Sequence, residues 1–374
     1  MEEKVYRFWL HNLPGVGDRT IEKLLSYFGS AQRACCAPPE EQKQVIKEKT
    51  IERISAFNKT FDPARAYEKM QEKNIAFYTI EDKEYPGRLR KIAHPPYALY
   101  CLGALPGEGR PAVAVIGARE CSEYGSYMAE AFAGKLARAG VSVISGMARG
   151  IDGIGQRAAL RSGGRTYGVL GCGVDICYPA SNRALYQEIA DSGGGILSVF
   201  PPGREPAKQQ FPERNRIVAG LSDLVLVVEA RQKSGTWITV DMALEQGKHV
   251  YAVPGRLTDR LSDGCNLLVR QGAGIALSPE DLLAEIALLT NRKELGKGSR
   301  ECAGVGIGDG KKQGMGAIRY LDYAPKSIVE IMEAMARAGE GRELPDVLGE
   351  LVGLCMEGRA RQVSGTYFAK VAEG

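Results

Sequence analysis

The feature that most constrains the fold is a series of short, unbroken runs of Val, Ile and Leu between residues 111 and 290. Runs such as 113–116 and 141–144 do not alternate with polar residues, which is typical of parallel strands buried on both faces. Helical patterns, such as the one over 124–139, separate most of these runs. This alternation predicts a doubly wound α/β domain with a mainly parallel sheet and right-handed crossovers. The further strands expected are 166–170, 195–199, 224–228 and 249–253, with a further helix over 155–161.

The 374 residues divide by composition into four segments. Residues 1–105 are rich in charged and helix-forming residues, and we expect an N-terminal helical domain with a connector there. Residues 106–290 carry the α/β pattern. Residues 291–316 are rich in glycine and lysine and predict a flexible linker, because such a segment buries little apolar surface. Residues 317–374 recover apolar periodicity and predict a small C-terminal domain.

Composition excludes several classes of protein. The formal net charge is +4, so the chain is neither a histone-like polycation nor an acidic tail, although a local basic patch is compatible with it. The nine cysteines form no CxxC pair, and the three histidines lie far apart, so we expect free thiols, no metal and no cofactor. No apolar run reaches the length of a membrane span, and the first residues lack a secretion signal. We therefore expect a cytoplasmic protein without membrane contact.

Glycine and arginine follow strand after strand in the α/β segment. The loops after the first two strands contain Gly117, Ala118 and Arg119, and Gly146, Met147 and Arg149; a later helix is preceded by Ser234 and Gly235. Ligands of such sheets bind beyond the carboxyl ends of the strands, where glycine lets a phosphate approach backbone N–H groups. The recurrence predicts an anion site at this edge. No GxxxxGK[ST] motif and no GxGxxG after the first strand occur, which argues against a P-loop NTPase and an ordinary dinucleotide fold.

A basic segment with one aromatic residue follows the fourth strand, and we expect it to be a loop. Phe211 lies between Lys208 and Arg214. Alternating cations and an aromatic ring suit single-stranded nucleic acid, whose bases stack and whose phosphates pair with charge. Phe211 could equally anchor the loop in the core. Arg214 and Arg216, on either side of Asn215, could equally hold the loop through backbone carbonyls.

Catalytic residues are difficult to identify. No histidine follows the strand-end motifs closely, and Ser145 and Ser234 have no evident base beside them. We therefore predict a binding protein with no catalytic residue.

Taken together, the motifs resemble the DprA/Smf family of DNA-processing proteins. They occur in order as Ile116-Gly117-Ala118-Arg119, Ser145-Gly146-Met147-Ala148-Arg149-Gly150-Ile151-Asp152, Gly171-Cys172-Gly173, Tyr178-Pro179, Phe211-Pro212-Glu213-Arg214-Asn215-Arg216, Ser234-Gly235-Thr236 and Val253-Pro254-Gly255. The resemblance covers the α/β segment. Two positions depart from the family's pattern: Gln156 stands where a histidine is frequent, and Val199 where a glutamate is frequent.

The resemblance implies an extended Rossmann-like domain that binds single-stranded DNA, protects incoming strands in natural transformation and helps to load the RecA recombinase. It also implies a homodimer formed through the later part of this domain. The DNA-binding residues carried over are Gly117, Ala118, Arg119, Gly146, Met147, Arg149, Lys208, Phe211, Arg214, Asn215, Arg216, Ser234 and Gly235.

The flanking segments are similar to the family's terminal domains. The Leu13-Pro14-Gly15-Val16-Gly17 turn is similar to a helix-hairpin-helix, in a domain of SAM-like type, although a simple turn between helices would look alike. Residues 328–335, 344–354 and 363–368 resemble a winged-helix domain, which could contact DNA or protein.

One alternative from another class stays open. Related folds bind nucleotides, and some resemble phosphoribohydrolases that cleave nucleoside monophosphates. The segment 234–239 supplies the Gly-Thr part of that enzyme motif and lacks its glutamate.

Overall fold

The computed structural model describes residues 2–290, 316–322, 326–364 and 367–371. They form two compact units, a larger one within residues 1–120 and 129–298 and a smaller one within residues 121–128 and 299–374. The predicted linker over 291–316 lies outside the described residues except for Gly316.

A nine-stranded sheet organises the larger unit, in the order β1-β2-β6-β5-β4-β3-β7-β8-β9. The strands from β6 to β9 in this order are parallel, whereas β1 and β2 join the β6 edge antiparallel. Each predicted strand is present within two residues of its expected bounds. The strands are β1 (Ile75–Thr79), β2 (Ala98–Gly103), β3 (Ala112–Ile116), β4 (Ser142–Ser145), β5 (Thr166–Val169), β6 (Gly195–Ser198), β7 (Leu224–Val227), β8 (His249–Ala252) and β9 (Gly274–Ile275).

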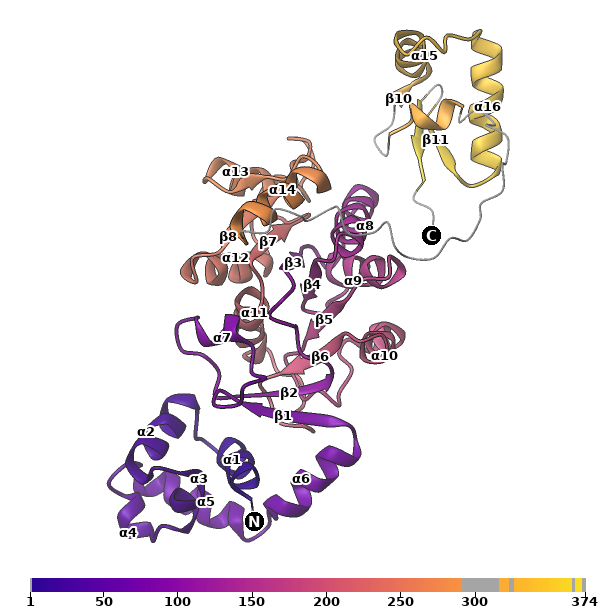
Figure 1. Cartoon of the computed structure of the whole chain (residues 1–374). Helices are drawn as coiled ribbons and strands as arrows, with labels where there is room; N and C mark the ends of the chain where they lie inside the picture. The colour runs from indigo at the N-terminus through magenta and orange to yellow at the C-terminus, as the bar shows by residue number, and fades with distance from the viewer. Residues whose placement is uncertain (1, 291–315, 323–325, 365–366, 372–374) are drawn as a thin grey trace. The chain divides into compact units, whose positions relative to one another are not determined.

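Helices cover both faces of this sheet (Figure 1). Helices α8 to α10 pack on one face and α11 and α12 on the other, which confirms the doubly wound α/β prediction. The helices are α7 (Gly87–Arg90), α8 (Glu123–Arg138), α9 (Ile151–Arg161), α10 (Arg183–Asp191), α11 (Gln210–Gly220), α12 (Thr236–Glu245), α13 (Asp263–Arg270) and α14 (Pro279–Leu289), with a 3₁₀ turn η1 (Ala180–Asn182).

The order of the strands places a switch point beside β3. From β3 the chain proceeds through β4 and β5 to β6 on one side, and it returns to β7 on the other side of β3. Connections on the two sides of β3 therefore diverge at its carboxyl end. A crevice at such a point is where open α/β sheets bind their ligands.

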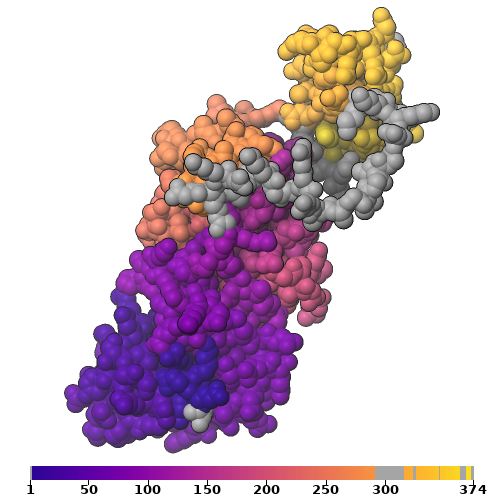
Figure 2. Space-filling view, viewed as in Figure 1, coloured from indigo at the N-terminus to yellow at the C-terminus, as the bar shows by residue number. Residues whose placement is uncertain are grey.

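The N-terminal residues are helical, as predicted, and they share a core with the sheet. Phe8 packs edge-on against Phe77 of β1 and Tyr100 of β2, with ring centroids 5.5 and 6.3 Å apart. The space-filling view shows the N-terminal helices continuous with the following sheet region (Figure 2). The strands β1 and β2 within residues 1–105 were not predicted. The helices are α1 (Glu3–Asn12), α2 (Asp18–Phe28), α3 (Ala31–Cys36), α4 (Pro39–Gln42), α5 (Glu48–Asn58) and α6 (Pro63–Glu72).

The smaller unit has its own core and a three-stranded sheet in the order β10-β12-β11. Ile331 and Met335 of one helix and Val347 and Leu351 of the next are buried against Phe368. The two predicted helices and the following strand pair are present, while the winged-helix assignment stays a prediction. The elements are η2 (Ala317–Arg319), β10 (Lys326–Ser327), α15 (Ile328–Arg337), α16 (Leu344–Met356), β11 (Ala360–Ser364) and β12 (Tyr367–Lys370).

Candidate nucleic-acid interface

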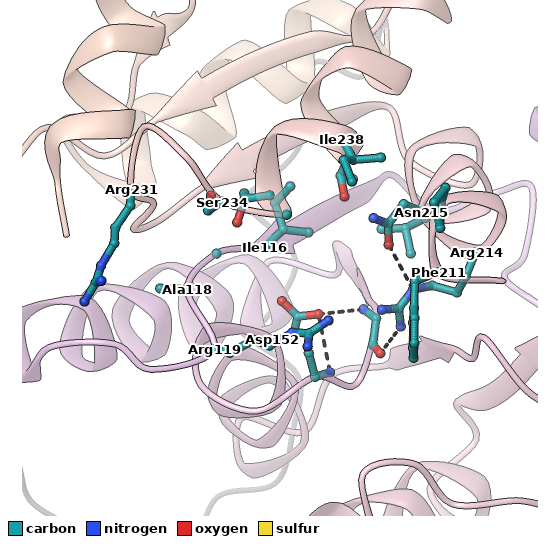
Figure 3. Close-up of a pocket in the computed structure, with 18 of the residues that line it drawn as sticks. Ile116, Ala118, Arg119, Asp152, Phe211, Arg214, Asn215, Arg231, Ser234 and Ile238 are labelled. Atoms are coloured by element: carbon teal, nitrogen blue, oxygen red, sulfur yellow. Dashed lines mark hydrogen bonds between the residues drawn. The ribbon is translucent and has the colours of Figure 1, made fainter. Parts of the chain in front are cut away.

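A pocket of about 680 Å³ lies in the larger unit where the carboxyl ends of β3 and β4 meet the first turns of α11 and α12 (Figure 3). It therefore occupies the switch point beside β3. Most of the predicted binding residues line it, whereas three do not. The lining residues among those predicted are Gly117, Ala118, Arg119, Gly146, Lys208, Phe211, Arg214, Asn215, Ser234 and Gly235.

The three predicted residues that do not line the pocket have other surroundings. Met147 is fully buried, and it takes a left-handed backbone conformation with φ 54°. Arg149 is exposed to solvent beside the same loop. Arg216 donates to the carbonyl oxygen of His94 and forms an ion pair of 3.1 Å with Glu213. These contacts favour the interpretation that Arg216 holds the chain through backbone carbonyls over the interpretation that it binds DNA.

Asp152 fixes the loop that follows β4. It lies in the first turn of α9 and accepts hydrogen bonds from the N–H groups of Gly146, at 3.1 Å, and Ala148, at 3.5 Å. A carboxylate at a helix N-terminus is electrostatically favourable. These two donors are therefore already engaged by the protein itself. Burial raises the pKa of Asp152, and the nearby charge of Arg214 opposes that shift.

Arg214 joins α11 to the ends of two strands. Its side chain is buried, and its Nη1 donates to the carbonyl oxygens of Gly146 and Val169, the second at 2.8 Å. Its Nε donates to Asn215 Oδ1 at 3.0 Å. These bonds favour the structural interpretation of Arg214, because they use the guanidinium to satisfy carbonyl groups that would otherwise be buried without partners.

Phe211 lies in the pocket within the first turn of α11, so the expectation that it sits in a loop was wrong. The following Pro212 is compatible with a helix here, because the first turn has no intrahelical acceptor for its missing N–H. The ring lies 5.8 Å from that of Tyr178, and the guanidinium of Arg119 lies 5.9 Å from the ring centroid. Tyr178 was not predicted as a binding residue and entered only through the Tyr178-Pro179 motif, yet it is 45% exposed and lines the pocket.

Three exposed cations line the same pocket as this aromatic pair. They are Arg119, Lys208 and Arg231, and none forms an ion pair with a carboxylate among the residues that the structure describes. Arg231 was not predicted; its signal was its place shortly after the strand β7, at the same edge as the glycine motifs. Free cations of this kind are available to an anionic ligand.

The start of α12 offers backbone donors to the same pocket. Its first N–H groups have no partner within the helix. A Cβ added at Gly235 would meet no atom within 4 Å, so the pocket is open at this helix end. The hydroxyl of the adjacent Ser234 is buried and has no hydrogen-bond partner among the described residues. An anionic group could use both features.

Comparison with known proteins decides the family. A model of the family described as DNA recombination-mediator protein A matches residues 76–287, which is more than half of the chain. The chain belongs to this family. The match spans the whole sheet region, so the pocket described above lies entirely within it.

Individual relatives agree. Protein Smf of Synechocystis is 37% identical over 290 residues, which cover 75% of this chain and 73% of that protein. DNA processing protein DprA of Streptococcus pneumoniae is 42% identical over 208 residues, which cover 56% of this chain and 73% of that protein. Its X-ray structure covers 76% of this chain and 97% of its own, at 34% identity and a TM-score of 0.63.

A further solved structure concerns the single-stranded DNA binding mode of DNA processing protein A from Helicobacter pylori. It is 32% identical to this chain, covers 57% of this chain and 96% of its own, and has a TM-score of 0.50. In the described part of this chain no helix is long and apolar enough to span a membrane. The same residues contain no cluster of three side chains suited to hold a metal.

The first prediction concerns Arg214. We expect Arg214→Ala to lower the free energy of unfolding by about 3–5 kcal/mol, because it leaves buried carbonyls without a donor and removes the positive charge that opposes the rise in the pKa of the buried Asp152. Because its pKa is raised, Asp152 binds a proton more readily in the folded than in the unfolded protein. The free energy of unfolding therefore rises as the pH falls toward the unfolded pKa of about 3.9, and removing Arg214, which opposes the raised pKa, strengthens this dependence. The loss should therefore be larger at pH 8 than at pH 5. Urea unfolding at both pH values measures it.

Arg149→Ala is the matched control, because Arg149 is exposed on the neighbouring loop. It should change stability by no more than about 0.5 kcal/mol. An Arg214→Ala loss that is equally large at both pH values would contradict the role assigned to Asp152.

Proposed function

We propose that this protein is a cytoplasmic recombination mediator that binds single-stranded DNA in the pocket beside β3. The observation that carries the proposal is that one pocket holds the Phe211 ring, cations that form no ion pair among the described residues and the open N-terminus of α12. Membership of the recombination-mediator family and the similarity to the Helicobacter pylori protein support it. Aromatic stacking combined with phosphate contacts is how proteins hold single strands without reading their sequence.

The residues that line the pocket suit three kinds of contact: with phosphates, with bases and with the backbone of α12. Arg119 and Lys208 would pair with phosphates, and Arg231 would extend this cationic edge. Phe211, with Tyr178 beside it, would stack on a base. Gly235 would let a phosphate or sugar approach the first N–H groups of α12, because no described residue fills the space where its side chain would be.

The pocket supports binding better than catalysis. Its lining contains no histidine and no cysteine among the described residues. Its buried carboxylate, Asp152, is engaged in holding the loop after β4. A general acid or base needs to reach the reacting atom. We therefore propose that the bound strand is not cleaved, and that no cofactor takes part.

Two variants separate charge from stacking. Lys208→Ala should weaken binding of poly-dT and of mixed sequences alike and flatten the slope of log K against log salt by about one unit. Phe211→Ala should lose roughly 1–3 kcal/mol of binding free energy with little change in that slope. Fluorescence anisotropy of labelled oligonucleotides across a salt titration measures both.

Lys59→Ala is the control, because Lys59 is an exposed lysine at the end of α5, remote from the pocket lining. It should leave affinity and slope unchanged. Unaltered binding by Lys208→Ala would contradict the assigned site. Displacement of the strand by AMP, with duplex DNA ineffective, would instead favour the nucleotide-binding alternative.

We also propose a homodimer formed through the later part of the sheet region. Strand β9 ends the sheet, so its outer edge has no neighbour among the described strands. Apolar side chains are exposed on and after it and on the following helix. These are Ile275 at 48%, Leu277 at 73%, Leu288 at 73% and Leu289 at 38% exposure. An open edge with adjacent apolar surface is a favourable pairing surface.

Leu277→Asp should shift the protein from dimer to monomer in light scattering, because it would bury an unpaired charge at the contact. Tyr27→Asp is the control, since Tyr27 is an exposed apolar side chain on α2, far from this segment in the chain. A parent protein that is already monomeric at micromolar concentration would refute the proposed dimer.

The partner we propose for the bound complex is a RecA-type recombinase. The test is strand exchange on single-stranded DNA that is coated beforehand with a single-strand binding protein. Adding this protein should shorten the lag before recombinase filaments form, and Lys208→Ala should restore the lag. An undiminished lag with the parent protein, despite tight DNA binding, would contradict recombinase loading while leaving the DNA site intact.

A further inference from the structure

A second pocket, of about 620 Å³, lies in the larger unit and shares no lining residue with the DNA site. It is formed by α1, α2 and the segment that connects β1 to β2. Apolar side chains contribute to its wall, among them Leu25, Ile80 and Pro95. The proposed function gives this pocket no role.

The basic side chains of the pocket each contact another side chain that lines it, although the buried Nε of Arg7 has no hydrogen-bond partner among the described residues. Arg7 forms an ion pair with Glu81 and lies 3.7 Å from Glu3. Arg19 donates to His94 Nε2 at 3.0 Å. An anionic ligand would have to displace one of these contacts. The pocket is therefore poorly suited to a phosphate or carboxylate.

Two carboxylates of α2, in contrast, form no ion pair among the described residues, although the charge of Arg216 acts on one of them, Asp18. Asp18 and Glu22 lie one helical turn apart on the face of α2 that lines the pocket. Neither forms an ion pair with a basic side chain among the described residues. Burial raises the pKa of Asp18 and the charge of Glu213 adds to this shift, whereas a backbone hydrogen bond from Tyr97 and the charge of Arg216 oppose it. The uncompensated charge of this pocket is negative.

An independent observation points to a ligand that carries hydrogen-bond donors. Tyr97 lines the pocket and is 5% exposed, yet its hydroxyl has no hydrogen-bond partner in the part of the chain that the structure describes. The charges that act on this hydroxyl include those of Arg7, Glu81 and Glu3, all of which line the same pocket. Buried hydroxyl groups in native proteins are nearly always paired, so an unpaired one indicates a missing partner.

We propose that this pocket binds an alkyl guanidinium or alkyl ammonium group. The cation would lie between Asp18 and Glu22, and its N–H groups would donate to these carboxylates and to the hydroxyl oxygen of Tyr97. The alkyl stem would contact the apolar wall. Two sources share this chemistry: an arginine or lysine side chain of a partner protein, and a free polyamine.

The experiment is a calorimetric titration of the full-length protein with three probes. Nα-acetyl-arginine amide represents a side chain, spermidine represents a polyamine, and Nα-acetyl-citrulline amide is the uncharged analogue of the first. We expect at least one cation to bind and citrulline not to bind. Binding of the arginine probe alone indicates a protein side chain, and binding of spermidine alone indicates a polyamine. Binding of both identifies a general cation site.

Variants locate the site. Glu22→Gln should weaken binding of the cation by about tenfold or more, since it removes one charge-assisted contact. Tyr97→Phe should also weaken cation binding. It should nevertheless raise the melting temperature of the free protein, because it deletes an unpaired buried hydroxyl. Glu52→Gln, on an exposed position of α5, should change neither quantity.

Single-stranded DNA binding serves as the folding check for every variant and should be unchanged. Failure of the cation site can therefore be distinguished from failure of the proposed DNA site. Absence of binding by both cations overturns the proposal. Equal binding of citrulline overturns it as well. Undiminished cation binding by Glu22→Gln and Tyr97→Phe together would do the same, since it would place the cation elsewhere.

Discussion

The pocket beside β3, which we propose as the DNA site, depends on the hydrogen bonds of the buried Arg214 guanidinium. The guanidinium comes from α11, on one face of the sheet, and it binds carbonyl oxygens at the ends of β4 and β5. Asp152, from α9 on the other face, binds the N–H groups of the same loop after β4. One cation and one anion thus satisfy the polar backbone where two strands end. Without them these groups would be buried and unpaired.

This internal pairing also determines which charges remain for a ligand. Arg214 and Arg216 are held by backbone carbonyls, and Asp152 is held by backbone N–H groups. Arg119 and Lys208 have no such partners among the described residues. The small net charge of +4 therefore does not prevent a cationic surface, because the basic residues at the pocket serve two separate purposes.

The sequence was informative where the pattern is local and less so where contacts are distant. The parallel strands could be predicted because they are continuous apolar runs between helical patterns. Strand β1 was missed because only alternate side chains are buried, within a segment otherwise rich in charge. The first turn of α11 was missed because a proline, Pro212, among the charged residues Lys208, Glu213 and Arg214 is typical of a loop. The role of Arg214 was left open because its partner carbonyls lie 68 and 45 residues earlier in the chain.

Two glycines of the strand-end and helix-start motifs, Gly117 and Gly235, look alike in the sequence but differ in their surroundings. A Cβ at Gly117 would lie 2.7 Å from the side chain of Ile151 and 2.8 Å from the carbonyl oxygen of Glu229, so the packing of the protein itself requires glycine there. At Gly235 no atom lies within 4 Å, and the backbone, with φ −64°, is one that any residue can adopt. Neither packing nor conformation requires glycine at that position. Both glycines line the same pocket, but of the two only Gly235 leaves space beside its backbone, so the start of α12 is open to a ligand and Gly117 is not.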